Sequence, residues 1–463
     1  MNKGGLLELV ARGKKDIFFT ANPTISFFHS VYIKSSPFTK EIYVSKPRNS
    51  PEWGRWVDFD FEHRGDIAKD TYLRIELPSW LPPNVQEINK SGIVTYDEQG
   101  TTYGYCNNIG FQMIEKIQFF QDQVKLHETF GEYLDWRLRQ SYTLSKTYVV
   151  GAQIGTYQET PLALGRTASG LVLRVPFSIL GWQNLQDPGL PMCALKNERF
   201  RIRVHLRKLE EIVVASDGRL NPNPWSKPLF VQSQKNGKID LSQVSKSRES
   251  MKNIGISLET TQVYIPADVQ LVLKSQTLRI PFNTIQFQQY TLEDNLLTAS
   301  SLNPQNIYKF PLAIDCIGSV NRMLLGFRSE ASTEAGQRTN LQKSVIHTLR
   351  LNIANIDRVK QWERTVFREV TNYWKNKRMG IDLLDTSEPH EVYTITLGGY
   401  DNGYPSGTVN FTRAVDSILF LTLGSIDYDP RNVSRKTFAL FYVEAWNIYE
   451  IANGKGKCMF DDS

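Results

Sequence analysis

Histidines have the widest chemical repertoire of any residue in this sequence, because an imidazole can bind a metal ion or exchange a proton near neutral pH. The 463-residue chain has six of them, and no two lie within the short spacing of a metal-ligand motif. An enzyme of the cupin type would need a clustered pair such as His-x-His followed by a glutamate. His205 stands alone among arginines in an alternating segment, which indicates a surface residue. The six positions are His29, His63, His127, His205, His347 and His390.

Other catalytic patterns are also missing from the sequence. No segment matches the Gly-x-Ser-x-Gly nucleophile elbow or the Gly-x-x-x-x-Gly-Lys-Ser/Thr phosphate-binding loop. Two carboxylate pairs, Asp382 with Asp385 and Asp427 with Asp429, stand in turn-rich segments, where acids usually cap backbone groups. We therefore expect no catalytic residue, no metal and no cofactor, which predicts a protein that is not an enzyme.

The route of synthesis follows from the cysteines and the apolar segments. The four cysteines lie far apart without a Cys-x-x-Cys pair, as expected for free thiols in a reducing compartment. The first 15 residues contain no apolar stretch of signal-peptide length, and the most apolar segment, 418–423, is too short to cross a bilayer. We expect a soluble protein made in the cytosol. The three N-glycosylation triplets, at Asn89, Asn410 and Asn432, are candidate modification sites, and this route argues against their use.

Alternation of apolar and polar residues recurs throughout the chain. In Phe200–Arg207, four apolar residues alternate with four polar ones, and Tyr72–Leu77 has the same pattern. A half-buried antiparallel sheet produces this period of two, so we predict an all-β protein. Segment 128–144 instead has helical spacing, which predicts a short inserted helix, and 359–374 fits either a helix or a strand pair. Further predicted strands are 171–175, 276–282, 349–353 and 438–446.

A turn-rich segment divides the chain into two halves. Ser216–Pro228 contains many turn residues, and the sequence that follows is polar as far as Lys252. We therefore predict an N-terminal arm (1–28), a first β-sandwich (29–215), a linker or long loop (216–253) and a second β-sandwich (254–463). The glycines and lysines of 454–457 predict a flexible basic tail at its end.

The net charge of +6 comes largely from one segment. Residues 1–50 contain eight Lys or Arg and three acids. This excess fits a solvated surface strip, and it equally fits an arm that faces anionic lipid or nucleic acid.

Several segments, in the order in which they occur, resemble the double jelly-roll major capsid proteins of nucleocytoplasmic large DNA viruses. The sequence departs from the family pattern at Ala21, where a glycine is common, and at Lys455 and Lys457 among the closing glycines. The segments that carry the resemblance are Gly4–Gly13 with Thr20–Phe28, Ile109–Ile117 with Gly131–Leu134, Val175–Phe177 with Pro188–Pro191, Leu349–Ile353 with Asp357, Pro405–Arg413, and Trp446–Gly456.

The resemblance implies two tandem eight-stranded jelly rolls and a homotrimer that serves as a six-sided capsomer in an icosahedral shell. The implied partners are neighbouring capsomers, minor capsid or cement proteins, penton proteins and the side of an inner membrane, with no specific nucleic acid. The implied location is the virion shell after synthesis in the host cytoplasm. As a hypothesis, the N-terminal segment contacts the membrane side through Lys3, Arg12, Lys14, Lys15, Phe18 and Phe19.

Three other classes of protein are alternatives. A carbohydrate-binding jelly-roll lectin would use exposed aromatic residues such as Trp53, Trp56 and Trp225. A cupin or glycoside hydrolase would need the histidine cluster that is missing. A minor capsid or penton protein usually has one jelly roll, whereas this chain is long enough for two.

Overall fold

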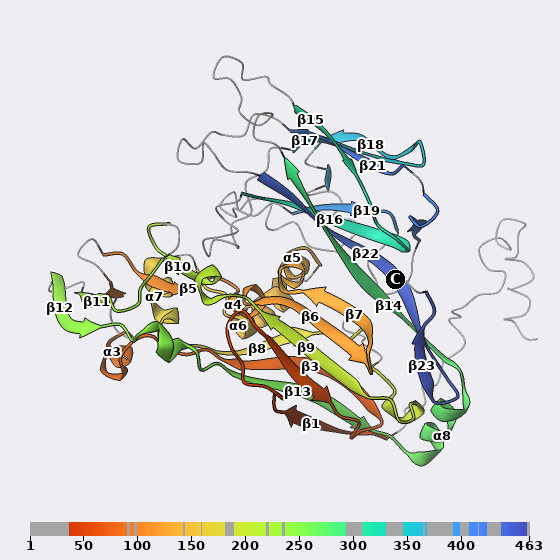
Figure 1. Cartoon of the computed structure of the whole chain (residues 1–463), viewed down its shortest axis with the longest axis horizontal. Helices are drawn as coiled ribbons and strands as arrows, with labels where there is room; N and C mark the ends of the chain where they lie inside the picture. The colour runs from red at the N-terminus through yellow and green to blue at the C-terminus, as the bar shows by residue number, and fades with distance from the viewer. Residues whose placement is uncertain are drawn as a thin grey trace, which may run out of the picture. The chain divides into compact units, whose positions relative to one another are not determined.

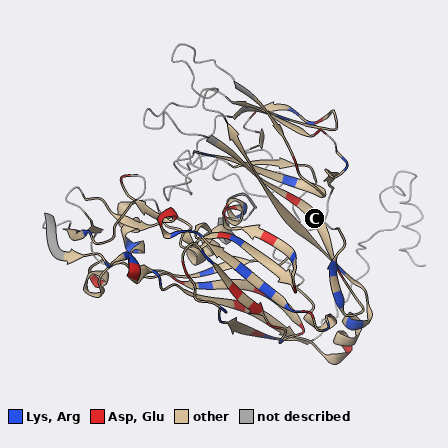
Figure 2. Ribbon diagram, viewed as in Figure 1, with Lys and Arg blue, Asp and Glu red and all other residues tan. Residues whose placement is uncertain are grey.

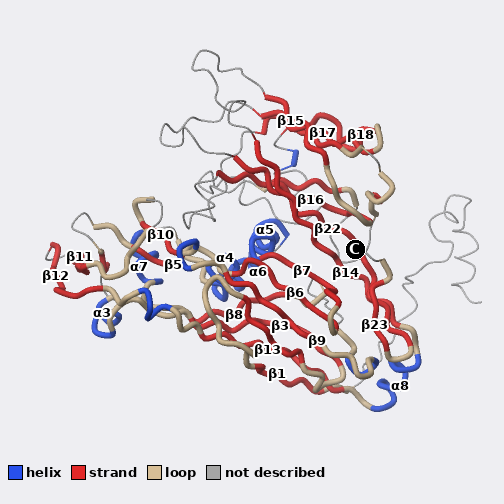
Figure 3. Tube along the Cα trace, in the orientation of Figure 1, coloured by secondary structure: helices blue, strands red, loops and turns tan. Residues whose placement is uncertain are grey.

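The computed structural model of the chain is built mainly from antiparallel β-sheets, with short helices between some strands (Figures 1 and 3). The chain divides into two compact units, Met1–Phe38 and Thr39–Ser463, and the described strands and helices belong to the second unit. The predicted all-β antiparallel class is confirmed. The structure describes residues 37–89, 93–96, 100–141, 144–158, 160–180, 189–218, 222–233, 237–292, 308–329, 346–363, 366–367, 392–398, 407–414, 416–423 and 437–460.

A first β-sandwich contains two four-stranded sheets, with strand orders β1-β13-β3-β8 and β2-β9-β6-β7. Alternate residues of each strand point into the space between the sheets. In β9, Phe200, Ile202, Val204 and Leu206 are buried and the residues between them are half exposed, as the alternating sequence predicted. The strands are β1 (Thr39–Ser45), β2 (Trp56–Phe61), β3 (Ile67–Glu76), β6 (Ile114–Gln121), β7 (Val124–Phe130), β8 (Val172–Phe177), β9 (Phe200–Leu206) and β13 (Gly255–Tyr264).

A second β-sandwich contains sheets of order β14-β22-β16-β19 and β15-β21-β17-β18. Two short strands extend the first of these sheets, β20 beside β16 and β23 beside β22. The strands are β14 (Leu278–Leu292), β15 (Tyr308–Ala313), β16 (Ser319–Ser329), β17 (Ile346–Ile353), β18 (Ile356–Glu363), β19 (Tyr393–Thr396), β20 (Val409–Asn410), β21 (Ile418–Leu423), β22 (Thr437–Ala452) and β23 (Lys455–Cys458).

The two sandwiches repeat one strand order. When the strands of the two four-stranded sheets are numbered along the chain, each sandwich has sheets of order 1-8-3-6 and 2-7-4-5. The chain changes sheet at every connection except that between strands 4 and 5. This is the arrangement of a jelly roll. The predicted pair of tandem jelly rolls is therefore present in the described part of the chain.

Smaller elements are inserted between the strands of the first sandwich. β10 pairs with β5, and the β11–β12 hairpin pairs with β4. This hairpin lies within 216–253, so the prediction of a linker or loop there is wrong for these strands. The turn-rich composition of 216–228 favoured a loop, so β11 was not predicted. Its alternate residues Leu229 and Val231 are buried. The inserted elements are β4 (Ile93–Thr95), β5 (Tyr103–Tyr105), β10 (Val213–Ala215), β11 (Pro228–Ser233), β12 (Gly237–Val244), α3 (Pro83–Ile88), α4 (Ile109–Gln112), α7 (Pro161–Thr167), η1 (Met192–Ala194), η2 (Leu209–Glu211) and η3 (Arg248–Met251).

The connection between the sandwiches lies later in the chain than predicted. β13 pairs with β1 and β3 and so completes the first sandwich, although the prediction placed residues from 254 onward in the second. The connection is residues 265–277, which include α8 (Ala267–Ser275). Alternation in β13 predicts a strand, but it cannot show which distant strands that strand will join.

The helix predicted over 128–144 is present over a shorter range. β7 continues through Phe130, and α5 (Gly131–Ser141) and α6 (Leu144–Ile154) follow it. Gly131 allows a close approach, because a Cβ there would lie 2.1 Å from the carbonyl oxygen of Phe111. The ambiguous segment 359–374 begins as part of strand β18, and residues after 367 in it lie outside the described part.

β22 and β23 form a hairpin, so the predicted flexible tail at 454–457 is wrong. β23 folds back on β22, with Ala452 opposite Lys455. The two residues between them, Asn453 and Gly454, have φ of 56° and 84°. A two-residue type I′ turn needs positive φ at both positions, and Asn-Gly is a favoured sequence for it. The basic, glycine-containing composition obscured this hairpin pattern.

Gly454→Ala is expected to lower the free energy of unfolding by about 1–2 kcal/mol, because a side chain disfavours positive φ. The new Cβ would also lie 2.9 Å from the side chain of Lys196. Chemical denaturation followed by tryptophan fluorescence measures the change. Asn453→Gly keeps the turn geometry and is the matched control, with an expected change within about 0.5 kcal/mol. Equal losses in both variants would contradict the turn assignment.

Candidate assembly site

The two longest strands of the second sandwich also pack into the first. β14 and β22 have 15 and 16 residues, about 50 Å when extended, and pair over the whole of β14. At one end, Ile280, Phe282, Tyr449 and Ile451 belong to the apolar core of the first sandwich. At the other end, residues of the same strands, such as Phe441, belong to the core of the second. One paired ribbon therefore joins both cores (Figure 1).

A buried carboxylate joins α5 of the first sandwich to the sheet of the second. Glu444 in β22 has no exposed surface. Its carboxylate accepts hydrogen bonds from Arg322 of β16 at 2.7 Å and from the hydroxyl of Tyr133 in α5 at 2.8 Å. The guanidinium of Arg137, also in α5, lies 3.3 Å from the same carboxylate. Because these charges are shielded from water, each depends on the others for its stabilisation.

A second buried ion pair joins the same two elements. Glu132 in the first turn of α5 pairs with Arg328 of β16 and accepts a hydrogen bond from the hydroxyl of Tyr442 at 3.1 Å. Burial raises the pKa of Tyr442 and of Tyr133 well above the ordinary value, so both phenols remain protonated donors. The carboxylate of Glu132 also lies at the positive end of the helix dipole.

Close aromatic packing completes the junction between the sandwiches. The Trp136 ring in α5 meets the Tyr442 ring edge-on, with 5.0 Å between centroids. β16 passes this indole at Gly326, where a Cβ would lie 2.6 Å from the ring. Ile285 and Leu324 belong to the same apolar cluster. The junction thus couples the two sandwiches through buried charge, hydrogen bonds and packing.

A buried histidine lies at the same boundary. The ring of His127 in β7 lies 6.2 Å from that of Phe282 in β14, and neither ring nitrogen has a hydrogen-bond partner among the described residues. Burial, with a smaller contribution from nearby Lys125, lowers the pKa of His127 from 6.5 to about 3. The imidazole is therefore neutral in the folded chain throughout the physiological range.

His127 is expected to destabilise the folded chain as the pH falls from 6.5. Below that pH the unfolded chain takes up a proton on this ring that the folded chain does not bind until about pH 3. The free energy of unfolding therefore falls by about 1.4 kcal/mol per pH unit, or about 2 kcal/mol at pH 5. In chemical denaturation between pH 7 and 5, His127→Leu should remove this slope. His205→Gln, at a half-exposed position, should change it less, and an unchanged slope in His127→Leu would contradict the assignment.

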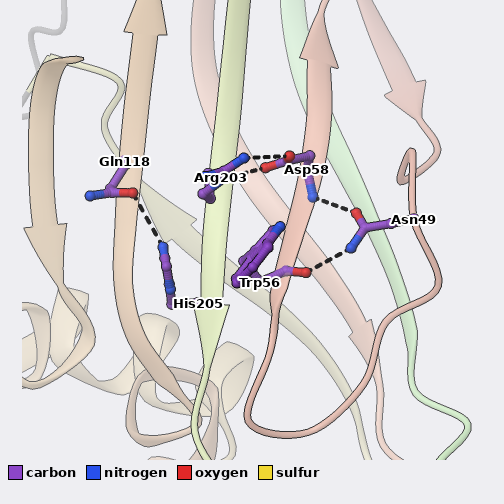
Figure 4. Close-up of polar contacts among 6 residues, drawn as sticks. All are labelled: Asn49, Trp56, Asp58, Gln118, Arg203 and His205. Atoms are coloured by element: carbon purple, nitrogen blue, oxygen red, sulfur yellow. Dashed lines mark hydrogen bonds and ion pairs between the residues drawn. The ribbon is translucent and has the colours of Figure 1, made fainter. Parts of the chain in front are cut away.

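The outward face of the sheet β2-β9-β6-β7 carries interacting polar and aromatic side chains (Figure 4). Arg203 donates hydrogen bonds to Asp58 at 2.7 and 2.9 Å, and its guanidinium lies 5.3 Å from the ring centroid of Trp56. Partial burial alone would raise the pKa of Asp58, but the hydrogen bonds and charge of Arg203 bring it below its ordinary value. His205 contacts Gln118 on the same face at 3.2 Å. Exposed tryptophan and arginine are enriched at protein interfaces, so this face is a candidate contact surface.

Comparisons with known proteins bear on both the sequence and the fold. No known family profile matches the chain. Probable capsid protein 4 of Acanthamoeba polyphaga mimivirus is 29% identical over 217 residues, which cover 45% of this chain and 38% of that protein. The major capsid protein of Paramecium bursaria Chlorella virus 1 is 21% identical, over 98% of each chain. The solved structure of the PBCV-1 virus capsid superposes with a TM-score of 0.68 at 13% identity, over 94% of this chain and 100% of that one.

The chain has the double jelly-roll fold of viral capsid proteins. Its homologues are named major capsid proteins of large DNA viruses, as the sequence resemblance predicted. The chain spans less than half the length of the first relatives that it matches. These relatives are structural capsid proteins and belong to a non-enzymatic family.

The six predicted membrane-side contact residues all lie outside the described residues: Lys3, Arg12, Lys14, Lys15, Phe18 and Phe19. The candidate glycosylation site Asn432 and both carboxylate pairs also lie outside them. Within the described ranges, no group of three or more His, Cys, Asp or Glu could hold a metal ion. No helix in the described part of the chain is long and apolar enough to span a membrane.

The two glycosylation asparagines that the structure describes differ in exposure. Asn89 is 2% exposed, and its amide nitrogen donates hydrogen bonds to the carbonyl oxygen of Gly165 and the hydroxyl of Ser169, both at 2.9 Å. A glycan at Asn89 would require this double jelly-roll chain to open locally. Asn410 is exposed in β20, so folding alone does not prevent its modification.

The aromatic residues that would support a lectin are mostly engaged in packing. The indole nitrogen of Trp53 donates to the carbonyl of Met251 at 2.8 Å, and Trp225 packs edge-on against Trp80 at 5.7 Å. Of the three, Trp56 has the exposed ring, at 50%. One exposed ring among these three tryptophans gives little support to a sugar-stacking site.

The buried charges between the two sandwiches were not predicted from the sequence. Glu444 lies on the same alternate positions as Tyr442 and Leu440, within the predicted strand 438–446. α5 covers this side of β22, so these side chains are buried. A charged residue within a strongly apolar strand is the sequence feature that could have indicated this buried charge.

Proposed function

We propose that this chain is a structural major capsid protein of a large DNA virus, and that three copies assemble into a six-sided capsomer. Three chains with two similar sandwiches each supply six similar walls, so a threefold assembly acquires a nearly hexagonal outline. Such blocks tile a flat shell facet through repeated side contacts.

The repeated strand order of the two sandwiches carries this proposal. A six-sided outline from three copies requires two similar modules per chain, held at a fixed angle. The buried contacts of Glu444 and Trp136 support such a fixed relation. The names of the homologues support the shell as the destination.

Sedimentation of the purified full chain over a range of concentrations tests the oligomeric state. We expect a species of three times the chain mass that persists on dilution, because obligate oligomers have large apolar interfaces. Contacts between capsomers should be smaller, more polar and weakened by salt. A chain that remains monomeric at high concentration would refute the proposal.

The partners in this proposal are further copies of the same capsomer, minor capsid or cement proteins, and penton proteins. The protein would be made in the host cytoplasm and incorporated into the outer shell of the virion. No specific nucleic acid is included.

The proposal includes the N-terminal segment as an arm at the base of the shell. Its basic and aromatic residues suit contact with the membrane side or with minor capsid proteins. Deletion of residues 1–16 is expected to leave soluble trimers and to reduce shell assembly, measured by particle yield in an expression system. Normal particles from the deleted chain would contradict this role.

A further inference from the structure

One end of the described unit brings together α8 and the turn between β22 and β23. Two residues separate α8 from β14, whose first residue, Leu278, lies opposite Ile451 of β22. The hairpin turn follows directly, and the amide of Lys196 donates to the carbonyl of Gly454 at 2.8 Å. We call this region the α8 surface, defined as residues 196–199, 267–279 and 450–457.

The α8 surface exposes apolar side chains on a helix. No residue of α8 is buried, and Leu271 and Val272 are 66% and 49% exposed. Val269 and Leu273 of the same helix are half buried. The structure therefore leaves a leucine and a valine on the outward side, where water solvates them unfavourably.

Basic residues lie on α8 and on β23 at this end of the fold (Figure 2). The α8 surface contains six basic residues and three acids. Glu450 is largely buried and pairs with Arg279 and Lys457, and Glu198 accepts a hydrogen bond from Gln121, so Asp268 is its exposed acid. The nearby loop 62–66 has mixed charges. The basic residues are Lys196, Arg199, Lys274, Arg279, Lys455 and Lys457.

The α8 surface lies at one end of the second sandwich, and the strand ends that bear four long connections lie at the other end. The connections β14–β15, β16–β17, β18–β19 and β21–β22 span 13 to 29 residues, and the register of the paired strands puts their ends together, away from α8. The chain also enters the second unit at the α8 end, because Thr39 at the start of β1 pairs with Tyr264.

We propose that the α8 surface binds an anionic lipid bilayer. Leu271 and Val272 would enter the interface between headgroups and acyl chains, while the lysines would contact lipid phosphates and carboxylates. A bilayer accepts scattered apolar side chains at shallow depth, whereas a protein partner needs a contiguous complementary patch. Binding of this kind requires neither a trimer nor a shell.

Vesicle flotation of the full chain tests the proposal. Vesicles of phosphatidylcholine with phosphatidylserine should carry the protein upward, vesicles of phosphatidylcholine alone should not, and added salt should weaken binding. The double variants Leu271→Asp/Val272→Asp and Lys455→Glu/Lys457→Glu should each bind about tenfold or more weakly. Val172→Asp, which changes a 70% exposed valine at the far end of the first sandwich, is the matched control and should bind within about twofold of the original chain.

Three outcomes would overturn the proposal. These are no flotation of the original chain, equal flotation of the original chain and both double variants, and binding to soluble poly-glutamate without binding to vesicles. The last would assign the surface to an acidic protein instead. Sedimentation of the same samples reports the trimer separately, so failure of lipid binding is distinguishable from failure of the capsid function.

Discussion

Glu444→Gln is expected to lower the free energy of unfolding by about 3–5 kcal/mol. The substitution keeps the shape of the side chain and removes its charge. It leaves the guanidiniums of Arg322 and Arg137, each 3% exposed in the side chain, without their shared carboxylate. Because neither cation can be hydrated in place, the loss far exceeds that of a surface ion pair. Chemical denaturation at neutral pH measures it.

Two further variants separate the buried charge from other effects. Glu76→Gln removes an exposed ion pair with Arg74 and should cost no more than about 1 kcal/mol. Replacing Glu444, Arg322 and Arg137 together by methionine should restore much of the stability, because none of these three positions then holds an unpaired buried charge. Similar losses for Glu444→Gln and Glu76→Gln would show that the junction is not closed to water.

Trp136→Ala is expected to cost about 3–5 kcal/mol, since it empties a large buried site. The indole is 2% exposed, contacts Tyr442 edge-on and fills the space that Gly326 leaves. Loss of this packing should also loosen the relation between the two sandwiches. We therefore expect increased hydrogen exchange in α5 and β16, beyond the fall in the denaturation midpoint.

Trp56→Ala is the matched control for this substitution. Trp56 is 50% exposed on the outward face of β2, so its removal should cost less than about 1 kcal/mol. If Trp136→Ala lowered the free energy of unfolding as little as Trp56→Ala does, the two sandwiches would not be coupled through this cluster.

The alternating pattern identified strands well and their partners poorly. The strands at Phe200–Leu206 and in the second half of β3, where Tyr72–Leu77 alternates, could be predicted because period-two burial is a local property of one strand. The membership of β13 in the first sandwich could not, because it depends on pairing with β1 and β3, about 200 residues earlier in the chain. The family resemblance supplied the two jelly rolls without their exact boundary.

The candidate site was harder to predict than the fold. A charged residue in an alternating strand normally faces water, so Glu444 was indistinguishable from a surface residue until α5 was seen to cover it. His127 lacked any sequence feature of a buried histidine apart from its alternate position in β7. Burial by a distant element is not encoded in the local pattern.

Electron microscopy of the purified full chain tests the central claim most directly. The two jelly rolls and their buried junction predict particles with threefold symmetry and a nearly six-sided outline. Single sandwiches, or pairs of sandwiches at variable angles that never associate, would contradict a shell-forming role.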